Sequence, residues 1–349
     1  MGPAERDRPA DEPAPSPERP PLLSRRAWLL LGANVLVGGG YAAKLLWDRH
    51  ERGRRAEVFV GRVPSYTGPI ADTLLRGLAS LGVGAQAVRG RTVLLKPNLV
   101  EPNRSAPHVN THPLVVQAAA EVFRRLGARE VWVAEGPGHM RDTELVLEES
   151  GLGPLLEAER LPFYDLNHED TAPVPNALGL TGLSQLHLPR VLARADLVVS
   201  LAKMKTHHWA GLTLSMKNLF GVVPGVAYGW PKNVLHQRGI GSSILDLTAT
   251  VRPHLAIVDG IVGMEGDGPI MGTPKAAGLL VVGRNPVAVD ATCARLMGFE
   301  PRRVPYLAAA AGKLGPVREG NIAQRGESIA PLVTPFTIVD HPSLRHLRG

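Results

Sequence analysis

From Glu57 onward the chain alternates short apolar runs with longer segments of helical periodicity, and this alternation constrains the fold more than any other feature. Helical patterns over residues 70–81, 112–126, 142–149 and 286–297 separate the runs. Apolar strands joined by helices are typical of a parallel sheet covered on both faces. The sequence therefore predicts an α/β fold with a mostly parallel sheet and helices on both faces. The strand-like runs are residues 58–60, 92–95, 131–134, 197–201, 255–258 and 279–282.

Polar or glycine-rich segments follow four of these runs directly. These segments contain Lys96, Glu135, Lys203 and Asp259. In an open parallel sheet the carboxyl ends of the strands lie along one edge, and ligands bind in the crevice there. We therefore expect four distant segments to converge on one cleft.

Four lysines of this region are candidates for holding a phosphate or carboxylate, because an ammonium group donates charge-assisted hydrogen bonds. A single lysine is usually a solvated surface charge, but Lys96 and Lys205 come directly after strands and are less easily explained that way. The loop from Glu135 to His139 has a flexible backbone near a helix start, which suits an anion, although a plain turn would look similar. The predicted substrate-binding residues are Lys96, Asn98, Glu135, Gly138, Lys203, Thr206, Lys217, Asn218 and Asp259.

Histidines and carboxylates in the same segments offer two kinds of chemistry. His207 and His208 are neighbours in an extended segment, so we expect their side chains to point to opposite sides. One of them, with His112, His139 or a carboxylate from another loop such as Glu265 or Asp267, could hold a divalent metal. Histidine also moves protons near neutral pH, so acid or base catalysis is equally open. The predicted catalytic residues are His207, His139, Lys205 and Glu265, and the predicted metal ligands are Glu265, Asp267 and His207.

The amino-terminal region has the order of an export leader. Residues 1–23 are rich in Pro and mixed charges, a composition typical of a disordered tail. Arg25 and Arg26 then precede an apolar stretch, so residues 24–47 are identified as a twin-arginine signal, with an uncleaved membrane anchor as the alternative. The leader predicts an extracytoplasmic location, in the periplasm or cell envelope, and the twin-arginine machinery as a partner.

Composition narrows the function classes. The formal net charge is +7, but basic and acidic residues are interspersed and aromatic residues make up only 5% of the 349 residues, so we expect no nucleic-acid partner. Cys293 is the only cysteine. A cysteine-ligated iron–sulfur cluster is therefore not expected within this chain. Cys293 falls in the helical pattern 286–297, where we expect it to be buried and not to act as a nucleophile.

Several motifs, taken in order, resemble those of the domain of unknown function 362 family. The resemblance covers residues 58–313 and implies an α/β domain over residues 57–320, with residues 321–349 as a C-terminal extension. It implies no particular activity. Some relatives have ferredoxin-like cysteine clusters, which this chain lacks. The matching segments are Val93–Asn98, Ala134–Gly138, Asp196–Ser200, Lys203–His207, Ser215–Asn218, Val258–Gly260, Gly263–Pro269 and Asn285–Asp290.

A fainter likeness links the chain to the lactate racemase family, which uses a nickel-pincer nucleotide. Gly138–Arg141 is similar to its Gly-His-Arg loop, although Met140 interrupts the pattern. Residues 207–217 and Asn285–Asp290 are similar to two further segments. This likeness implies two lobes around a cleft more than it implies the racemase reaction.

These features together predict an extracytoplasmic cleft enzyme, assisted by a metal or cofactor, that acts on a small anionic or phosphorylated substrate. A protein that binds the same ligand or helps to mature a cofactor without chemistry is the first alternative, and a racemase-like enzyme is the second.

Replacing Arg25 and Arg26 together by lysine should abolish export, because the twin-arginine machinery recognises the arginine pair itself. Cell fractionation of the full-length chain measures this. Replacing Arg54 and Arg55 by lysine provides a matched control outside the leader. Unchanged export of the Arg25→Lys, Arg26→Lys variant would rule out the twin-arginine assignment.

Overall fold

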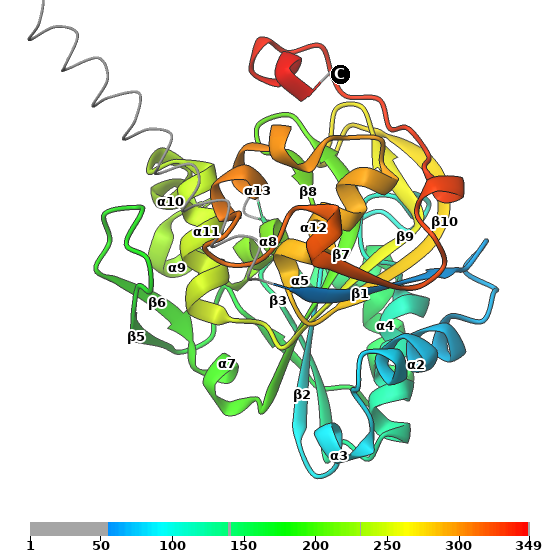
Figure 1. Cartoon of the computed structure of the whole chain (residues 1–349). Helices are drawn as coiled ribbons and strands as arrows, with labels where there is room; N and C mark the ends of the chain where they lie inside the picture. Colours follow the sequence, from blue (N-terminus) through cyan, green and yellow to red (C-terminus); the bar gives the residue numbers. More distant parts are fainter. Residues whose placement is uncertain (1–54, 139–140, 231, 348–349) are drawn as a thin grey trace, which may run out of the picture. The chain divides into compact units, whose positions relative to one another are not determined.

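The apolar runs form strands of one large sheet in the computed structural model, which describes residues 55–138, 141–230 and 232–347. Within those residues the sheet has nine strands in the order β11-β1-β10-β9-β7-β2-β3-β4, with β8 paired to β7 (Figure 1). Strands β9, β7, β2, β3 and β4 are mutually parallel, as are β1 and β11. The mostly parallel sheet is therefore confirmed. The strands are β1 (Ala56–Arg62), β2 (Thr92–Pro97), β3 (Glu130–Glu135), β4 (Phe163–Asp165), β7 (Leu197–His207), β8 (Gly211–Thr213), β9 (Leu255–Glu265), β10 (Thr273–Gly283) and β11 (Ile322–Gly326).

Helices cover both faces of the sheet, as predicted (Figure 1). One face packs against α2 (Ile70–Ser80), α4 (Pro113–Arg125), α5 (Thr143–Ser150) and α6 (Leu152–Ala158). Helices on the opposite face include α8 (Ser215–Asn218), α11 (Ile240–Val251), α12 (Pro286–Leu296) and α13 (Pro305–Ala310). The remaining short helices are α3 (Ala85–Val88), α7 (Arg190–Arg194), α9 (Gly225–Tyr228) and α10 (Asn233–Gln237).

Alternate residues of each central strand enter different cores. Leu94 packs in the core that contains α8, α11 and α12, whereas Val93 and Leu95 pack in the core that contains α2 and α4. Both faces of the strand are buried, so its middle residues are apolar on both faces. The strands consequently have continuous apolar sequences, which is what made them recognisable.

Strand β10 differs from the parallel arrangement expected for the run 279–282. It is antiparallel to both β9 and β1. Only residues 266–272 separate β9 from β10, and a connection this short joins antiparallel neighbours, because parallel strands need a crossover of a dozen or more residues.

Strands β7 and β9 are longer than the sequence predicted. They were expected to end at Leu201 and Val258, but they continue to His207 and Glu265. Lys203 pairs with Asp259, and β8 pairs with the end of β7, so neighbouring strands provide backbone partners for this polar extension. The polar residues of β7 therefore lie in a strand and not in the loop after it.

Residues 150–190 contain α6, β4 and a separate antiparallel pair, β5 (Thr171–Pro175) and β6 (Gln185–Pro189). The two-lobed arrangement is not confirmed, because the described residues belong to one compact unit. The segment predicted as a C-terminal extension contributes β11 and buries Phe336 and Leu344.

None of the helices among the described residues is long and apolar enough for a membrane span. The predicted tail and leader, residues 1–47, lie outside the described residues.

Cys293 lies on α12 and is completely buried, as predicted. Burial raises the pKa of its thiol well above the ordinary value. The thiol is therefore a packing group within the core and not a nucleophile.

Candidate functional site

A cavity of about 560 Å³ lies at the carboxyl ends of the parallel strands. Each of four neighbouring strands contributes to its wall: Asn98 follows β2, Glu135 ends β3, His207 ends β7 and Asp267 follows β9. Segments far apart in the sequence thus meet here because the strands run in the same direction. The predicted site residues that line the cavity are Asn98, Glu135, Gly138, His207, Lys217, Asn218 and Asp267.

A buried ion pair forms one end of this cavity. Lys96 Nζ lies 2.5 Å from Glu135 Oε2 and 3.2 Å from Asn218 Oδ1, and neither charged side chain is appreciably exposed. The backbone N–H groups of Leu99 and Gly136 also donate to Glu135. Lys96 and Glu135 therefore neutralise one another.

Gly221 allows the chain after α8 to approach this ion pair. A Cβ atom at that position would overlap Glu135 Oε1 and would lie 2.5 Å from Lys96 Nζ. Any larger residue would displace one of the two charged groups, so the absent side chain is a steric requirement of the site.

Two further lysines border the cavity without a carboxylate partner. Lys232 is buried and donates only to the carbonyl oxygens of Gly136 and Phe220 among the described residues. Its backbone is left-handed, with φ +69°, a strained conformation for a residue with a side chain. The ammonium group of Lys217 has no hydrogen-bonding partner among those residues, and its Nζ lies 4.0 Å from the centroid of the Phe220 ring.

The missing counter-charge affects both ammonium groups. Burial, together with the nearby Lys96 charge, lowers the pKa of Lys217 to about 8, although Glu135 opposes the shift. Burial likewise lowers the pKa of Lys232 to about 7, against the attraction of Glu135. Burial penalises the charged form, and one carboxylate already paired with Lys96 cannot compensate for three cations.

Two neutral groups in the wall also lack partners. Asn98 Oδ1 and Thr213 Oγ1 are buried and make no hydrogen bond with the described residues. Buried polar atoms without partners are rare, since each costs about 1–3 kcal/mol. The cavity therefore provides cationic groups and uncommitted hydrogen-bonding atoms for a polar ligand.

The two neighbouring histidines were expected to point apart, but their ring centroids are only 5.0 Å apart and both residues line the cavity. His208 has left the strand for a turn, so the alternation of side chains no longer applies. His207 Nδ1 accepts hydrogen bonds from the N–H groups of Trp209 and Ala210, at 3.0 and 3.1 Å. The neutral ring must then carry its proton on Nε2.

His208 has the opposite arrangement. Its Nδ1 lies 3.2 Å from Asp267 Oδ1, and a carboxylate at this position favours a proton on Nδ1. Nε2 of the neutral ring is then an acceptor. Burial, followed by the charge of Lys217, holds the pKa of His207 well below its ordinary value. One ring is thus a neutral donor, and its neighbour is a potential base.

Asp290 of α12 positions the short helix that bears Lys217. Its carboxylate accepts hydrogen bonds from the backbone N–H groups of Ser215 and Met216, at 2.8 and 3.0 Å, and from the Ser215 hydroxyl. Tyr306 donates a fourth. Burial raises the pKa of Asp290 to about 7, while these hydrogen bonds oppose the shift.

Other predicted site residues lie close by but do not line the cavity. Lys203 forms a buried pair with Asp259, at 2.7 Å, and also donates to Tyr66. Lys205 donates to the carbonyl oxygens of Val109 and Pro269, and Thr206 donates to that of Gly266. These contacts bind strands and loops together. His139, a predicted catalytic residue, lies outside the described residues.

The three predicted metal ligands are engaged separately. Glu265 pairs with Lys275 and accepts from the N–H group of Thr337, Asp267 contacts His208, and His207 accepts from the backbone. Within residues 55–138, 141–230 and 232–347, no three His, Cys, Asp or Glu side chains are grouped to hold a metal. The predicted metal set is therefore not brought together.

Sequence reasoning missed Lys232, Thr213 and the role of His208. Lys232 lies in an irregular segment after Gly229, where no strand end or helical period marks it. Its approach to Glu135 depends on tertiary packing.

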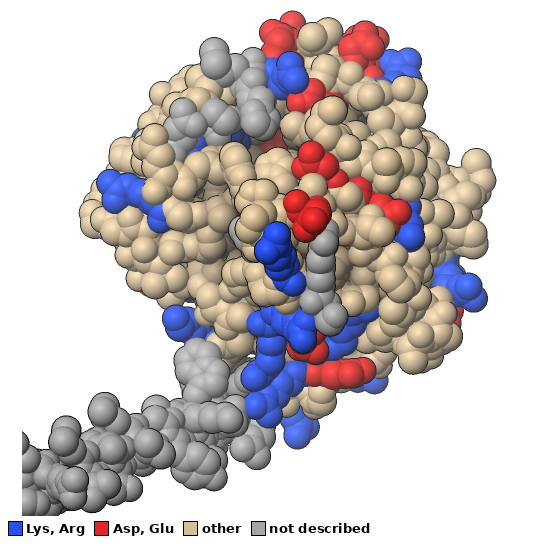
Figure 2. Space-filling view, turned by 90° about the horizontal axis from the view of Figure 1, so that it is seen from above, with Lys and Arg blue, Asp and Glu red and all other residues tan. Residues whose placement is uncertain are grey.

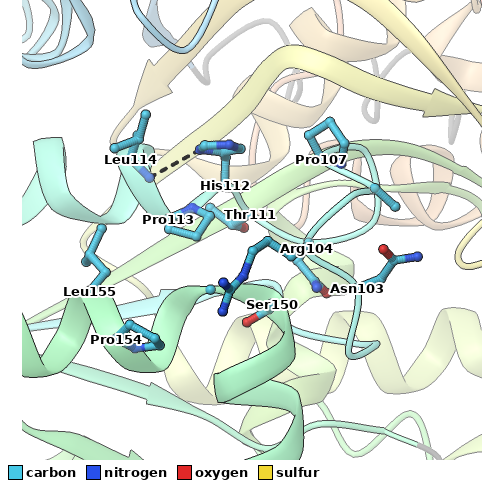
Figure 3. A pocket seen from close by; sticks show the side chains of 13 residues that line it. Asn103, Arg104, Pro107, Thr111, His112, Pro113, Leu114, Ser150, Pro154 and Leu155 are labelled. Carbon is cyan, nitrogen blue, oxygen red and sulfur yellow. Dashed lines mark hydrogen bonds between the residues drawn. The ribbon is translucent and has the colours of Figure 1, made fainter.

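A second cavity, of about 320 Å³, lies at the start of α4 (Figure 3). Its polar groups already have partners. His112 Nδ1 accepts from the N–H group of Leu114, Thr111 donates to Leu201, and Arg104 donates to Glu148. The larger cavity is thus the better candidate, because the Lys217 ammonium, Asn98 Oδ1 and Thr213 Oγ1 in its wall have no hydrogen-bonding partner among the described residues.

Figure 2 shows basic and acidic side chains interspersed among larger areas of other residues on one face. Lys96, Lys203 and Lys205, in contrast, are completely buried. These three lysines therefore do not contribute to the visible surface.

Fold and site together define an α/β protein with a polar cavity at the carboxyl edge of its parallel strands, and two of the lysines that line this cavity lack a carboxylate partner among the described residues. Residues 93–295 match the family described as "Domain of unknown function (DUF362)", and the chain belongs to that family. A thylakoid-associated protein of Synechocystis sp. is 30% identical over 246 residues, which cover 68% of this chain and 74% of the relative.

Two solved structures match part of the chain at low similarity. The lactate racemase apoprotein from Thermoanaerobacterium thermosaccharolyticum matches 71% of this chain with 15% identity and a TM-score of 0.43. A Thermotoga maritima protein matches 64%, with 15% identity and a TM-score of 0.35. The matches span only 58% and 57% of those two proteins, and no activity is inferred from them.

Replacing Asp290 by asparagine should loosen α8, because the amide NH₂ group would face backbone N–H groups. We expect the amide protons of Ser215 and Met216 to exchange much faster and the free energy of unfolding to fall by about 1–3 kcal/mol. Hydrogen exchange and chemical denaturation measure the two effects.

Asp246 supplies a matched control for this variant. It is also buried and accepts hydrogen bonds from Asn176, Leu180 and Thr181. Asp246→Asn should lower stability without affecting exchange at Ser215 and Met216. Equal exchange at those amides in the two variants would contradict a positioning role for Asp290.

Proposed function

We propose that this protein is an enzyme. It would bind a small anionic molecule in the larger cavity and remove a proton from that molecule. The observation that supports this most directly is the pair of ammonium groups, on Lys217 and Lys232, with no carboxylate partner among the described residues. A phosphate or carboxylate group would supply the missing charge. It would also accept hydrogen bonds from both lysines.

The histidines favour catalysis over simple binding. In their neutral forms His207 offers an N–H donor and His208 an acceptor oriented by Asp267, and both border the same cavity. Such a base can take a proton from a bound molecule, while the neutral N–H donor beside it hydrogen-bonds the oxygen on which negative charge develops. A protein that only holds an anion would need the lysines but not this pair.

The place of action belongs to the same proposal. The twin-arginine motif supports delivery to an extracytoplasmic compartment, with an uncleaved leader as an anchor. The Synechocystis relative is named for its association with thylakoids, which is compatible with work at a membrane. We retain a small anion and the export machinery as the proposed partners, and a bound divalent metal stays a prediction from the sequence.

Anion affinity should fall as the pH rises through about 7 to 8, because Lys232 and Lys217 lose their protons there when no ligand is bound. Binding should also take up protons, since a bound anion raises both pKa values again. Calorimetric titration with sulfate, whose charge is constant in this range, measures the affinity. Two buffers of different ionisation enthalpy give the proton uptake.

Lys217→Gln and Lys232→Gln should each weaken sulfate binding by about tenfold or more, as expected for the loss of a charge-assisted hydrogen bond. Lys275→Gln is the control, because Lys275 pairs with Glu265 and does not line the cavity. Equal affinities in all three variants, or an affinity independent of pH, would count against the anion site.

The neutral forms of His207 and His208 should be opposite tautomers, with the proton on Nε2 and Nδ1 respectively. NMR correlation of ring nitrogens with ring protons reports the tautomer directly. Asp267→Asn should shift the tautomer balance of His208 and leave that of His207 unchanged. Finding both rings in the same tautomer would remove the structural basis for a donor on His207 beside a base on His208.

A further inference from the structure

The larger cavity has an apolar, exposed end in addition to its charged, buried end. Trp209 is 59% exposed and Met271 is 77% exposed, whereas Lys232 is 4% exposed and Glu135 is 2% exposed. All four residues line the same cavity. A ligand that reached from Lys232 to Trp209 would therefore pass from a charged to an apolar environment.

Aromatic rings form much of the wall between these ends. The ring centroids of Trp209 and His236 are 6.1 Å apart, and those of His236 and Phe220 are 5.3 Å apart. His208 meets Trp209 edge to face at 4.8 Å. These separations lie within the range for interacting rings, so the side chains form a connected aromatic surface.

The charged and aromatic parts of the site meet at Lys217. Its Nζ lies 4.0 Å from the centroid of the Phe220 ring, and both residues line the cavity. An anionic group held by this ammonium would therefore place any attached body beside the ring surface of Phe220 and His236.

The size of the cavity agrees with a ligand that has such a body. About 560 Å³ is typical of sites for organic ligands of moderate size, well beyond the need of a lone phosphate. An isolated exposed apolar side chain needs no explanation. Here, however, Trp209 and Met271 border a cavity that also contains two lysines without a carboxylate partner among the described residues.

We propose that the ligand is an aryl anion: a flat aromatic body that bears one phosphate or carboxylate group. This inference rests on the proposed function, because the anionic group would occupy the Lys217–Lys232 site. The aromatic body would lie against Trp209, His236 and Phe220. The ammonium groups of the two lysines can donate hydrogen bonds to a phosphate or to a carboxylate, and the binding measurement distinguishes these two head groups.

The test compares probes with matched head groups on the full-length protein. Inorganic phosphate is compared with phenyl phosphate, and acetate with phenylacetate, by calorimetric titration at one pH. We expect each phenyl compound to bind at least about tenfold more tightly than its parent anion. Whichever of phenyl phosphate and phenylacetate binds more tightly identifies the head group. Benzyl alcohol, which has the ring but no charge, should bind far more weakly than both phenyl anions.

Variants locate the effect of the ring. Trp209→Ala should bring the ratio of phenyl to parent affinity close to one, and Trp209→Phe should restore most of it. Leu145→Ala is the control, since Leu145 is 52% exposed on α5 and does not line the cavity. It should preserve the ratio.

The possible failures are distinguishable. Equal affinities for phenyl and parent anions would overturn the aryl ligand while leaving the anion site intact. Benzyl alcohol binding as tightly as the phenyl anions would also overturn it, because the charge would then contribute nothing. If neither parent nor phenyl anions bind, the proposed function itself fails.

Discussion

The ion pair between Lys96 and Glu135 is the interaction on which the rest of the site depends. It joins the ends of β2 and β3, and through Asn218 it also holds α8. Removing two charges from water costs several kcal/mol for each ion, so the pair persists only because its geometry is close and backbone N–H groups complete the hydrogen bonding of Glu135. Gly221 leaves the space that this arrangement requires.

The same pair explains why positive charge is left over. Glu135 is committed to Lys96, so Lys217 and Lys232 have no local counter-ion. Their folded-state pKa values, about 8 and about 7, lie below the ordinary value of 10.5. Between these folded-state pKa values and 10.5 the unfolded chain therefore binds more protons than the folded chain. The free energy of unfolding consequently decreases as the pH falls from 10.5 toward 7. Asp290 and its hydrogen bonds help to hold Lys217 in place despite this cost. An anion that bound both cations would remove the imbalance.

The sequence predicted the features that depend on local pattern. Apolar runs indicated the strands, and their common direction placed Asn98, Glu135, His207 and Asp267 around one cavity. Features that depend on contacts between distant segments could be predicted less well from the sequence. Pairing with neighbours extended β7 and β9 past their apolar parts, and the short β9–β10 connection, which could have been read from its length, was missed. Lys232 reaches the cavity from an irregular segment, so no periodicity could indicate it.

Lysines of the same edge have different roles because their partners differ. Lys203 faces Asp259 and Tyr66, so its charge is satisfied within the protein. Lys205 donates to two carbonyl oxygens, which accept hydrogen bonds but supply no full negative charge. Burial, followed by repulsion from Lys203, accordingly holds the pKa of Lys205 well below its ordinary value. Lys217 alone among these three borders the cavity. Position at a strand end thus identifies the neighbourhood of a site, whereas access to the cavity together with the lack of a counter-charge distinguishes Lys217 from Lys203 and Lys205.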